Sequence, residues 1–76
     1  RLSRARRPGP QPGAKLTESE LRVLRLYELG LSRAQVAAEL FVTTNTVKTH
    51  SRAIYRKLGV TSRGDAVERG GELGLL

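Results

Sequence analysis

Three helix starts of one type follow each other between Leu16 and Val47, and they constrain the fold more than any other feature of the sequence. In each, an apolar residue precedes a Ser or Thr that can cap a helix, and a second apolar residue follows four positions after the cap: LTESEL, LSRAQV and VTTNTV. The two apolar side chains can close over the helix start as a hydrophobic staple. Because the connections between these helices are very short, we expect helices packed at steep angles instead of a long antiparallel bundle.

A fourth start follows Gly59, with Thr61 or Ser62 as its cap, so the sequence predicts an all-α domain over residues 16–76. The four expected helices cover residues 18–29, 33–40, 44–58 and 63–70. In the first two, Glu20 and Gln35 stand where a side chain can complete a capping box, and Asp65 can complete one from Ser62 in the fourth.

The end of the chain is the weakest part of this pattern. Gly70 and Gly71 each disfavour a helix by about 1 kcal/mol relative to alanine, so we expect the fourth helix to fray there. Beyond it, Leu73, Leu75 and Leu76 form either a tail packed back on the first helix or an exposed apolar end. The sequence leaves both arrangements open.

Residues 1–15 differ in composition from the rest of the chain. They hold all three prolines and five basic residues, but no acidic residue and almost no apolar one. Such a segment cannot form a packed element, so we expect a disordered basic linker that can also add nonspecific phosphate contacts. Because the chain begins at Arg1 rather than at methionine, we expect it to be a piece of a longer protein.

The composition argues against several classes of function. The chain has no cysteine and a single histidine, His50, so we expect neither a metal site, nor a cofactor, nor catalysis. A chain of 76 residues also builds only a modest core, too small to enclose a sizeable substrate cavity. No apolar run is long enough to span a membrane, which predicts a soluble, cytoplasmic protein. The glutamates of the first expected helix do not converge with any nucleophile or general base, so we expect the protein not to be an enzyme.

Positive charge is concentrated in one window of the sequence. The chain has 14 Lys and Arg against 7 Asp and Glu, but residues 40–64 contain no acidic residue at all. The basic residues of this window are Lys48, Arg52, Arg56, Lys57 and Arg63. The charge is therefore focused on the third helix instead of serving general solubility.

The third helix has two different sides. At about 100° per residue, Val47, Ile54 and Leu58 fall on an apolar side. The opposite side carries Asn45, Lys48, Thr49, Arg52 and Arg56. One side can be held in a small core while the other lies against a polyanion, as a recognition helix in a DNA major groove requires. A basic stripe of this kind is also typical of a solvated helix face.

The sequence resembles the LuxR-type (GerE or FixJ/NarL-type) four-helix DNA-binding domain over residues 16–76. The matching elements are the LTESE opening, the GLS turn, TVKTH at the start of the third helix, KLGV at its end and RGDAV in the fourth. The strings IYRKLGV and LGLL are most similar to the C-terminal output domains of large MalT-like regulators. The resemblance implies a helix-turn-helix formed by residues 33–40 and 44–58, with the second helix in the major groove.

The resemblance also implies which residues touch double-stranded DNA. Lys48, Thr49 and Arg52 match positions that contact base edges in this family. Lys48 and Arg52 can donate to guanine, the Thr49 methyl can meet a thymine methyl, and each good contact is worth about 1–3 kcal/mol of discrimination. Phosphate contacts are expected at the helix N-terminus and its flanks, from Thr43, Thr44, Asn45, Thr46, Arg56, Lys57 and Arg33.

By the same resemblance, the protein acts as a homodimer on two half-sites about 10 base pairs apart. The dimer contact is expected on the fourth helix around Ala66 and Val67, and the isolated fragment is expected to be monomeric or weakly dimeric. RNA polymerase is a further candidate partner.

Two features need a structural expectation of their own. The aromatic residues Tyr27, Phe41 and Tyr55 are scattered, so we expect them in the core or at its edge rather than in a base-stacking platform. Ser51 stands where a larger apolar residue is common in the family, and we expect it to loosen the packing under the third helix.

The expected function is sequence-specific binding of double-stranded DNA, as the output domain of a bacterial transcription regulator in the nucleoid. Two alternatives remain open at this point. One is a sigma-factor-like region that acts mainly through RNA polymerase, and the other is a basic module that binds an acidic protein.

Overall fold

The computed structural model describes residues 16–76, and the linker predicted over residues 1–15 lies outside the described residues. The fold is all-α as predicted, with α1 (Glu18–Glu28), α2 (Arg33–Leu40), α3 (Thr44–Leu58) and α4 (Arg63–Glu72). The bounds of α2 and α3 are those predicted, whereas α1 ends one residue earlier and α4 ends two residues later. Within this part of the chain, no helix has the length and apolar character that crossing a membrane requires.

Each helix begins at a Ser or Thr whose side-chain oxygen accepts a backbone N–H three residues later. These caps are Thr17, Ser32, Thr43 and Ser62. Two expected capping boxes are confirmed: Glu20 accepts the Thr17 amide at 2.9 Å, and Gln35 accepts the Ser32 amide at 2.8 Å. At the fourth helix, the Asp65 amide bonds to the Ser62 hydroxyl, but the Asp65 side chain does not complete the box. Because a cap and its partner are three residues apart, the amino-acid order alone places these helix starts.

The four helices also end alike. After each last turn, one backbone N–H bonds to the carbonyl three residues back and the next N–H bonds to the carbonyl five residues back, which is the Schellman motif. The residues in the left-handed position of these motifs are Gly30, Phe41, Gly59 and Gly74. Phe41, with φ 59°, is the one non-glycine residue with positive φ in residues 16–76.

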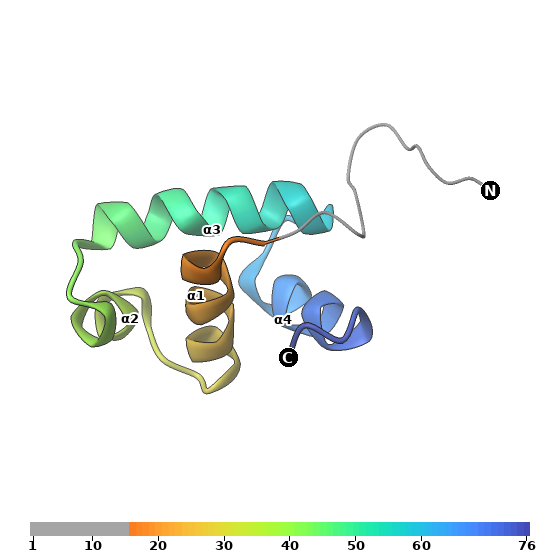
Figure 1. Cartoon of the computed structure of the whole chain (residues 1–76), viewed down its shortest axis with the longest axis horizontal. Coiled ribbons are helices and arrows are strands. Elements are labelled where there is room, and N and C mark those ends of the chain that lie inside the picture. Colours follow the sequence, from red (N-terminus) through yellow and green to blue (C-terminus); the bar gives the residue numbers. More distant parts are fainter. Residues whose placement is uncertain (1–15) are drawn as a thin grey trace.

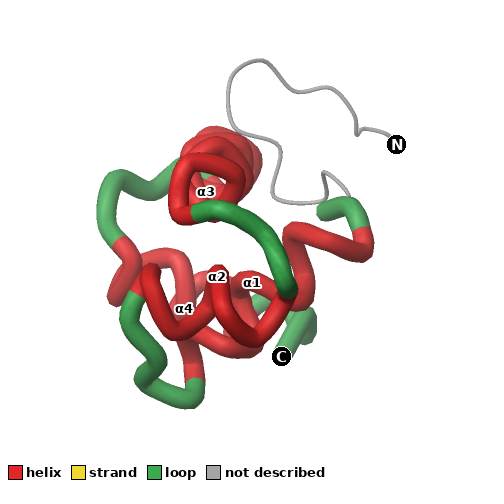
Figure 2. The backbone as a smooth tube through the Cα atoms, turned by 90° about the vertical axis from the view of Figure 1, so that its left-hand side faces the viewer, coloured by secondary structure: helices red, strands yellow, loops and turns green. Residues whose placement is uncertain are grey.

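The core lies between α3 and the other three helices. In Figure 1, α3 runs along one side of the domain with α1, α2 and α4 all beneath it, and the turned view in Figure 2 shows the same arrangement. α3 contacts each of these helices. The largest fully buried side chains are Leu24, Ile54, Leu58, Val23, Val36 and Val47. The described helices therefore cover α3 from one side and leave its other long side uncovered.

The C-terminal leucines pack back on the core, which decides between the two arrangements left open by the sequence. Leu73, Leu75 and Leu76 are partly buried against it. α4 does not stop at Gly70 as expected, because this residue is buried where α1, α4 and the tail meet. A Cβ atom at Gly70 would lie 2.9 Å from Leu24 Cδ2 and 3.3 Å from Leu76 Cδ1. Close packing that only glycine allows thus outweighs its low helix propensity.

Candidate nucleic-acid interface

The uncovered side of α3 carries the basic and polar side chains that the sequence predicted there. Its exposed residues include Asn45, Lys48, Thr49, Arg52 and Arg56. The buried residues of the same helix are Val47, Ser51, Ile54 and Leu58. Because residues 40–64 contain no acidic residue, no carboxylate from this stretch neutralises the exposed side. The fold therefore presents one positive helix face, held rigidly from behind.

The N-terminus of α3 is capped and polar. Thr43 Oγ1 accepts the Thr46 amide at 3.1 Å and also lies 3.1 Å from Thr46 Oγ1. Thr44 and Asn45 are exposed in the first turn, where backbone N–H groups have no acceptor within the helix. These amides, at the positive end of the helix dipole, suit an anionic oxygen. Arg33 is exposed at the first position of α2.

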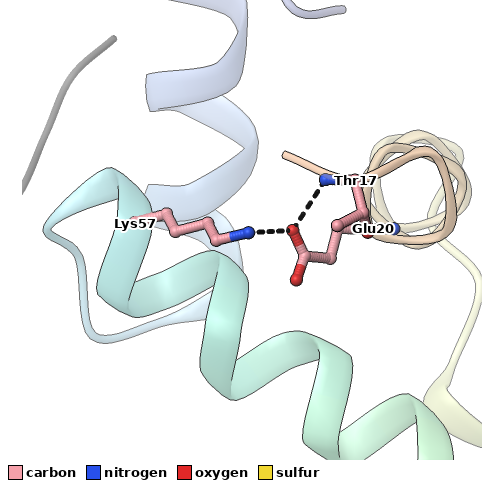
Figure 3. A network of polar contacts seen from close by, with 3 residues as sticks. All are labelled: Thr17, Glu20 and Lys57. Carbon is pink, nitrogen blue, oxygen red and sulfur yellow. Dashed lines mark hydrogen bonds and ion pairs between the residues drawn. The ribbon is translucent and has the colours of Figure 1, made fainter. Parts of the chain in front are cut away.

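Lys57 is placed differently from the other predicted phosphate contacts. Its Nζ lies 2.8 Å from Glu20 Oε1, the oxygen that also accepts the Thr17 amide (Figure 3). The Glu20 side chain is only 8% exposed and that of Lys57 only 24%. The ammonium group therefore neutralises a buried carboxylate and ties the last turn of α3 to the first turn of α1. Sequence reasoning missed this partner because the two residues are 37 positions apart.

The Glu20–Lys57 pair makes stability depend on pH. Burial raises the pKa of the Glu20 carboxyl, but the hydrogen bonds from Lys57 and the Thr17 amide, with the charges of Lys57 and His50, outweigh it and hold the pKa below its ordinary value of 4.5. A carboxyl with a lower pKa in the folded state stabilises the fold above its unfolded pKa, and this contribution is lost as the pH falls through the folded pKa.

We therefore expect the melting temperature of Glu20→Gln to fall less steeply than that of the wild type as the pH drops below about 4.5. The measurement is thermal unfolding followed by circular dichroism, in steps from pH 7 to about pH 3. Glu28→Gln, which removes an exposed carboxylate from the same helix, is the matched control and should follow the wild type. If Glu20→Gln also follows the wild type over this range, the ion pair adds nothing to stability.

Ser51 does not loosen the packing under α3, so that expectation was wrong. Ser51 Oγ donates to the Val47 carbonyl at 2.9 Å and lies 2.6 Å from the hydroxyl of Tyr27. Because Ser51 donates its hydroxyl proton to the Val47 carbonyl, the Tyr27 hydroxyl is the donor in the bond between Tyr27 and Ser51. The guanidinium of Arg63 stacks over the Tyr27 ring, 4.5 Å from its centroid. A polar contact between α1 and α3 thus replaces an apolar one.

The aromatic residues divide into two groups. Tyr27 is buried and Tyr55 is partly buried, as predicted, whereas the prediction for Phe41 was wrong because its side chain is 94% exposed. Phe41 occupies the left-handed position of the turn between α2 and α3, and from there its side chain does not reach the core.

α4 presents a different surface from α3. The Ala66 side chain has no exposed area and belongs to the core, so it cannot contact a second copy directly, which corrects its predicted role. Val67 is partly buried. Acidic residues dominate a shallow hollow of about 200 Å³ beside α4, which is lined by Val60, Asp65, Glu68, Arg69 and Glu72. Within residues 16–76, no three His, Cys, Asp or Glu side chains are grouped so that they could hold a metal ion.

Comparison with known proteins agrees with this geometry. The family model described as bacterial regulatory proteins, luxR family, matches residues 14–69, which is most of the chain. The chain belongs to the luxR family. The resemblance stated from the sequence is therefore confirmed, and α2 and α3 form the helix-turn-helix of the family's DNA-binding domain.

A solved structure gives the fold a direct parallel. The response regulator ChrA of a heme-sensing two-component system is 41% identical to this chain, with a TM-score of 0.81. The match covers 87% of this chain and 33% of ChrA, so the chain spans about a third of the length of that response regulator.

Proposed function

We propose that this domain binds double-stranded DNA in a sequence-specific manner, with α3 in the major groove, as the output domain of a bacterial transcription regulator. The observation that carries the proposal is the uncovered, acid-free face of α3, which three helices support from the other side. Such a helix can enter the groove without any change in the core. Membership of the luxR family supports the same function.

Sequence is read, in this proposal, by Lys48, Thr49 and Arg52. All three are exposed and lie on the same face of α3, with Arg52 one turn after Lys48. Arg52 can donate two parallel hydrogen bonds to guanine O6 and N7, Lys48 can donate one, and the Thr49 methyl can contact a thymine methyl.

Phosphates are held at the ends and flanks of this face. The amides of Thr44 and Asn45 and the side chains of Arg33 and Arg56 are exposed in positions that suit backbone contacts. The remaining predicted phosphate ligands at this end are Thr43 and Thr46, which also cap the helix. For Lys57 we propose a structural role in place of a phosphate contact, because its ammonium is bound to Glu20.

The same proposal extends to the assembly on DNA. Two copies would pair on DNA through α4 around Val67, each on a half-site about 10 base pairs from the other. Ala66 would support this surface only through packing. A further domain would control the pairing, as the architecture of a response regulator suggests, and RNA polymerase would be contacted from the bound dimer. A protein that binds DNA in this way would act in the bacterial cytoplasm.

The test is fluorescence anisotropy of the chain with a random pool of duplex DNA, and with duplexes enriched from that pool, at several salt concentrations. We expect a palindromic or direct-repeat site to be enriched without RNA polymerase present, and the preference to persist at high salt. A requirement for polymerase would instead favour the sigma-factor-like alternative. Binding that is indifferent to sequence, and lost on deleting residues 1–15, would contradict base readout by α3.

A further inference from the structure

The four helix ends allow a comparison within the chain itself. All four form the same Schellman motif, and glycine holds the left-handed position in three of them, at Gly30, Gly59 and Gly74. At the end of α2 the position belongs to Phe41, with φ 59°. A residue with a Cβ atom is strained in this conformation and glycine is not. The end of α2 therefore differs from the other three helix ends, where glycine avoids this strain.

The left-handed turn satisfies two carbonyls of α2, as glycine would also do, but the phenylalanine ring gives no compensation for the strain. The Phe41 side chain is 94% exposed, the largest exposure among the large apolar residues of the described part of the chain. An exposed ring gains almost nothing from burial. Backbone strain that persists without a folding benefit points to a role outside the domain.

The place of Phe41 limits what its ring can meet. It lies in the turn that joins α2 to α3, two residues before Thr43, the cap of α3. This is the polar, positive end of the proposed DNA-reading helix, and the window from residue 40 to residue 64 is free of acidic residues. An anionic partner suits this setting, and membership of the luxR family favours DNA as that partner.

From these observations we infer that the ring of Phe41 is a DNA contact, packed against the duplex at the edge of the major groove where α3 enters. The apolar surfaces available there are thymine methyl groups and deoxyribose rings, and phenylalanine makes such contacts with thymine methyls. The inference rests on the proposed function and adds an uncharged contact to the charged and polar ones already assigned.

The test compares Phe41→Gly with the wild-type chain on one duplex enriched by the wild type. We expect the dissociation constant to rise by about 5- to 30-fold. Because no charge is removed, the slope of affinity against salt concentration should stay the same. The melting temperature should rise by roughly 2–6 °C, since glycine relieves the left-handed strain. Weaker binding by a more stable protein excludes unfolding as the cause.

Three further variants separate the ring from the backbone. Phe41→Tyr keeps the ring and should bind within about twofold of the wild type, whereas Phe41→Asn tolerates the left-handed backbone without a ring and should bind as weakly as Phe41→Gly. Leu29→Ala removes another exposed apolar side chain, at the end of α1 that points away from α3 (Figure 1), and should leave binding unchanged.

Wild-type affinity in Phe41→Gly and Phe41→Asn would overturn the inference and leave the proposed function intact. Equal losses in Phe41→Tyr and Phe41→Gly would also overturn it, because the ring would then not be the group that matters. Failure of the wild-type chain to bind duplex DNA would overturn both the inference and the proposed function.

Discussion

The double variant Lys48→Ala/Arg52→Ala should lose about 100-fold of its preference for an enriched site over random duplex DNA. Each residue is assigned one base contact, and a good contact contributes about 1–3 kcal/mol of discrimination, so the loss of two contacts of about 1.4 kcal/mol each gives this factor. Stability should change by less than about 0.5 kcal/mol, because both side chains are exposed and alanine is a strong helix former. Anisotropy with both duplexes and thermal unfolding measure the two quantities.

The control is the double variant Arg22→Ala/Arg25→Ala, which removes the same charge from exposed positions on α1. Lower net charge weakens all DNA binding, so this control should lose affinity for both duplexes alike and keep its preference. An α3 variant that behaves like the control would show that the basic face attracts DNA without reading it. An α3 variant with unchanged affinity would favour the protein-interaction module.

Local rules explain why so much of the fold could be predicted from the sequence. A cap such as Ser32 and its partner Gln35 lie within one helical turn, so their bond depends on nothing distant. The caps therefore predicted the bounds of α2 and α3 correctly. Once the start of α3 was known, the helical repeat also predicted its buried side and its basic side.

Tertiary contacts explain what the sequence did not predict. α4 passes through Gly70 because Leu24 and Leu76 crowd the position, a contact that helix propensity does not contain. Ala66 was assigned to a dimer surface by analogy, but its side chain faces the core. Phe41 is exposed because it occupies the left-handed position of the turn after α2. Glycine usually marks such a position in a sequence, and here the residue is phenylalanine.

In the candidate site, the sequence predicted which face of α3 is exposed, but not which of its basic residues are paired with a carboxylate. Lys57 and Arg56 are adjacent basic residues that the sequence treats alike, yet Arg56 is exposed and Lys57 is bound to Glu20. The difference follows from where the first turn of α1 meets the last turn of α3. Only the packed structure brings those two turns together.

Replacing Lys57 with methionine should lower the free energy of unfolding by about 2–3 kcal/mol. Methionine keeps the apolar stem but removes the cation, which leaves the Glu20 carboxylate buried with the Thr17 amide as its remaining donor. We expect a smaller decrease than the 3–5 kcal/mol typical of a broken buried pair, because Lys57 is partly exposed and Glu20 can take up a proton. For a domain of this size, the melting temperature should fall by roughly 8–20 °C.

The variant Glu20→Gln in the Lys57→Met background tests the cause of this loss. Glutamine can still accept the Thr17 amide through its side-chain oxygen but carries no charge to leave unpaired. Adding it to Lys57→Met should therefore restore part of the lost stability, and the double-mutant cycle gives the coupling of the pair. If the two substitutions destabilise additively, the ion pair is not what holds α1 and α3 together.

The same Lys57→Met protein separates a structural role from a phosphate contact. A lysine that neutralises a phosphate releases about one counterion, so its loss would lower the slope of log affinity against log salt by about 0.9. A lysine bound to Glu20 has no such effect, and we expect the slope to match the wild type at a temperature where both proteins are folded. Arg56→Ala is the positive control, because an exposed arginine one residue away should lower the slope. An unchanged slope with reduced stability would show that the charge of Lys57 acts within the domain, on the Glu20 carboxylate between α1 and α3, and not on DNA.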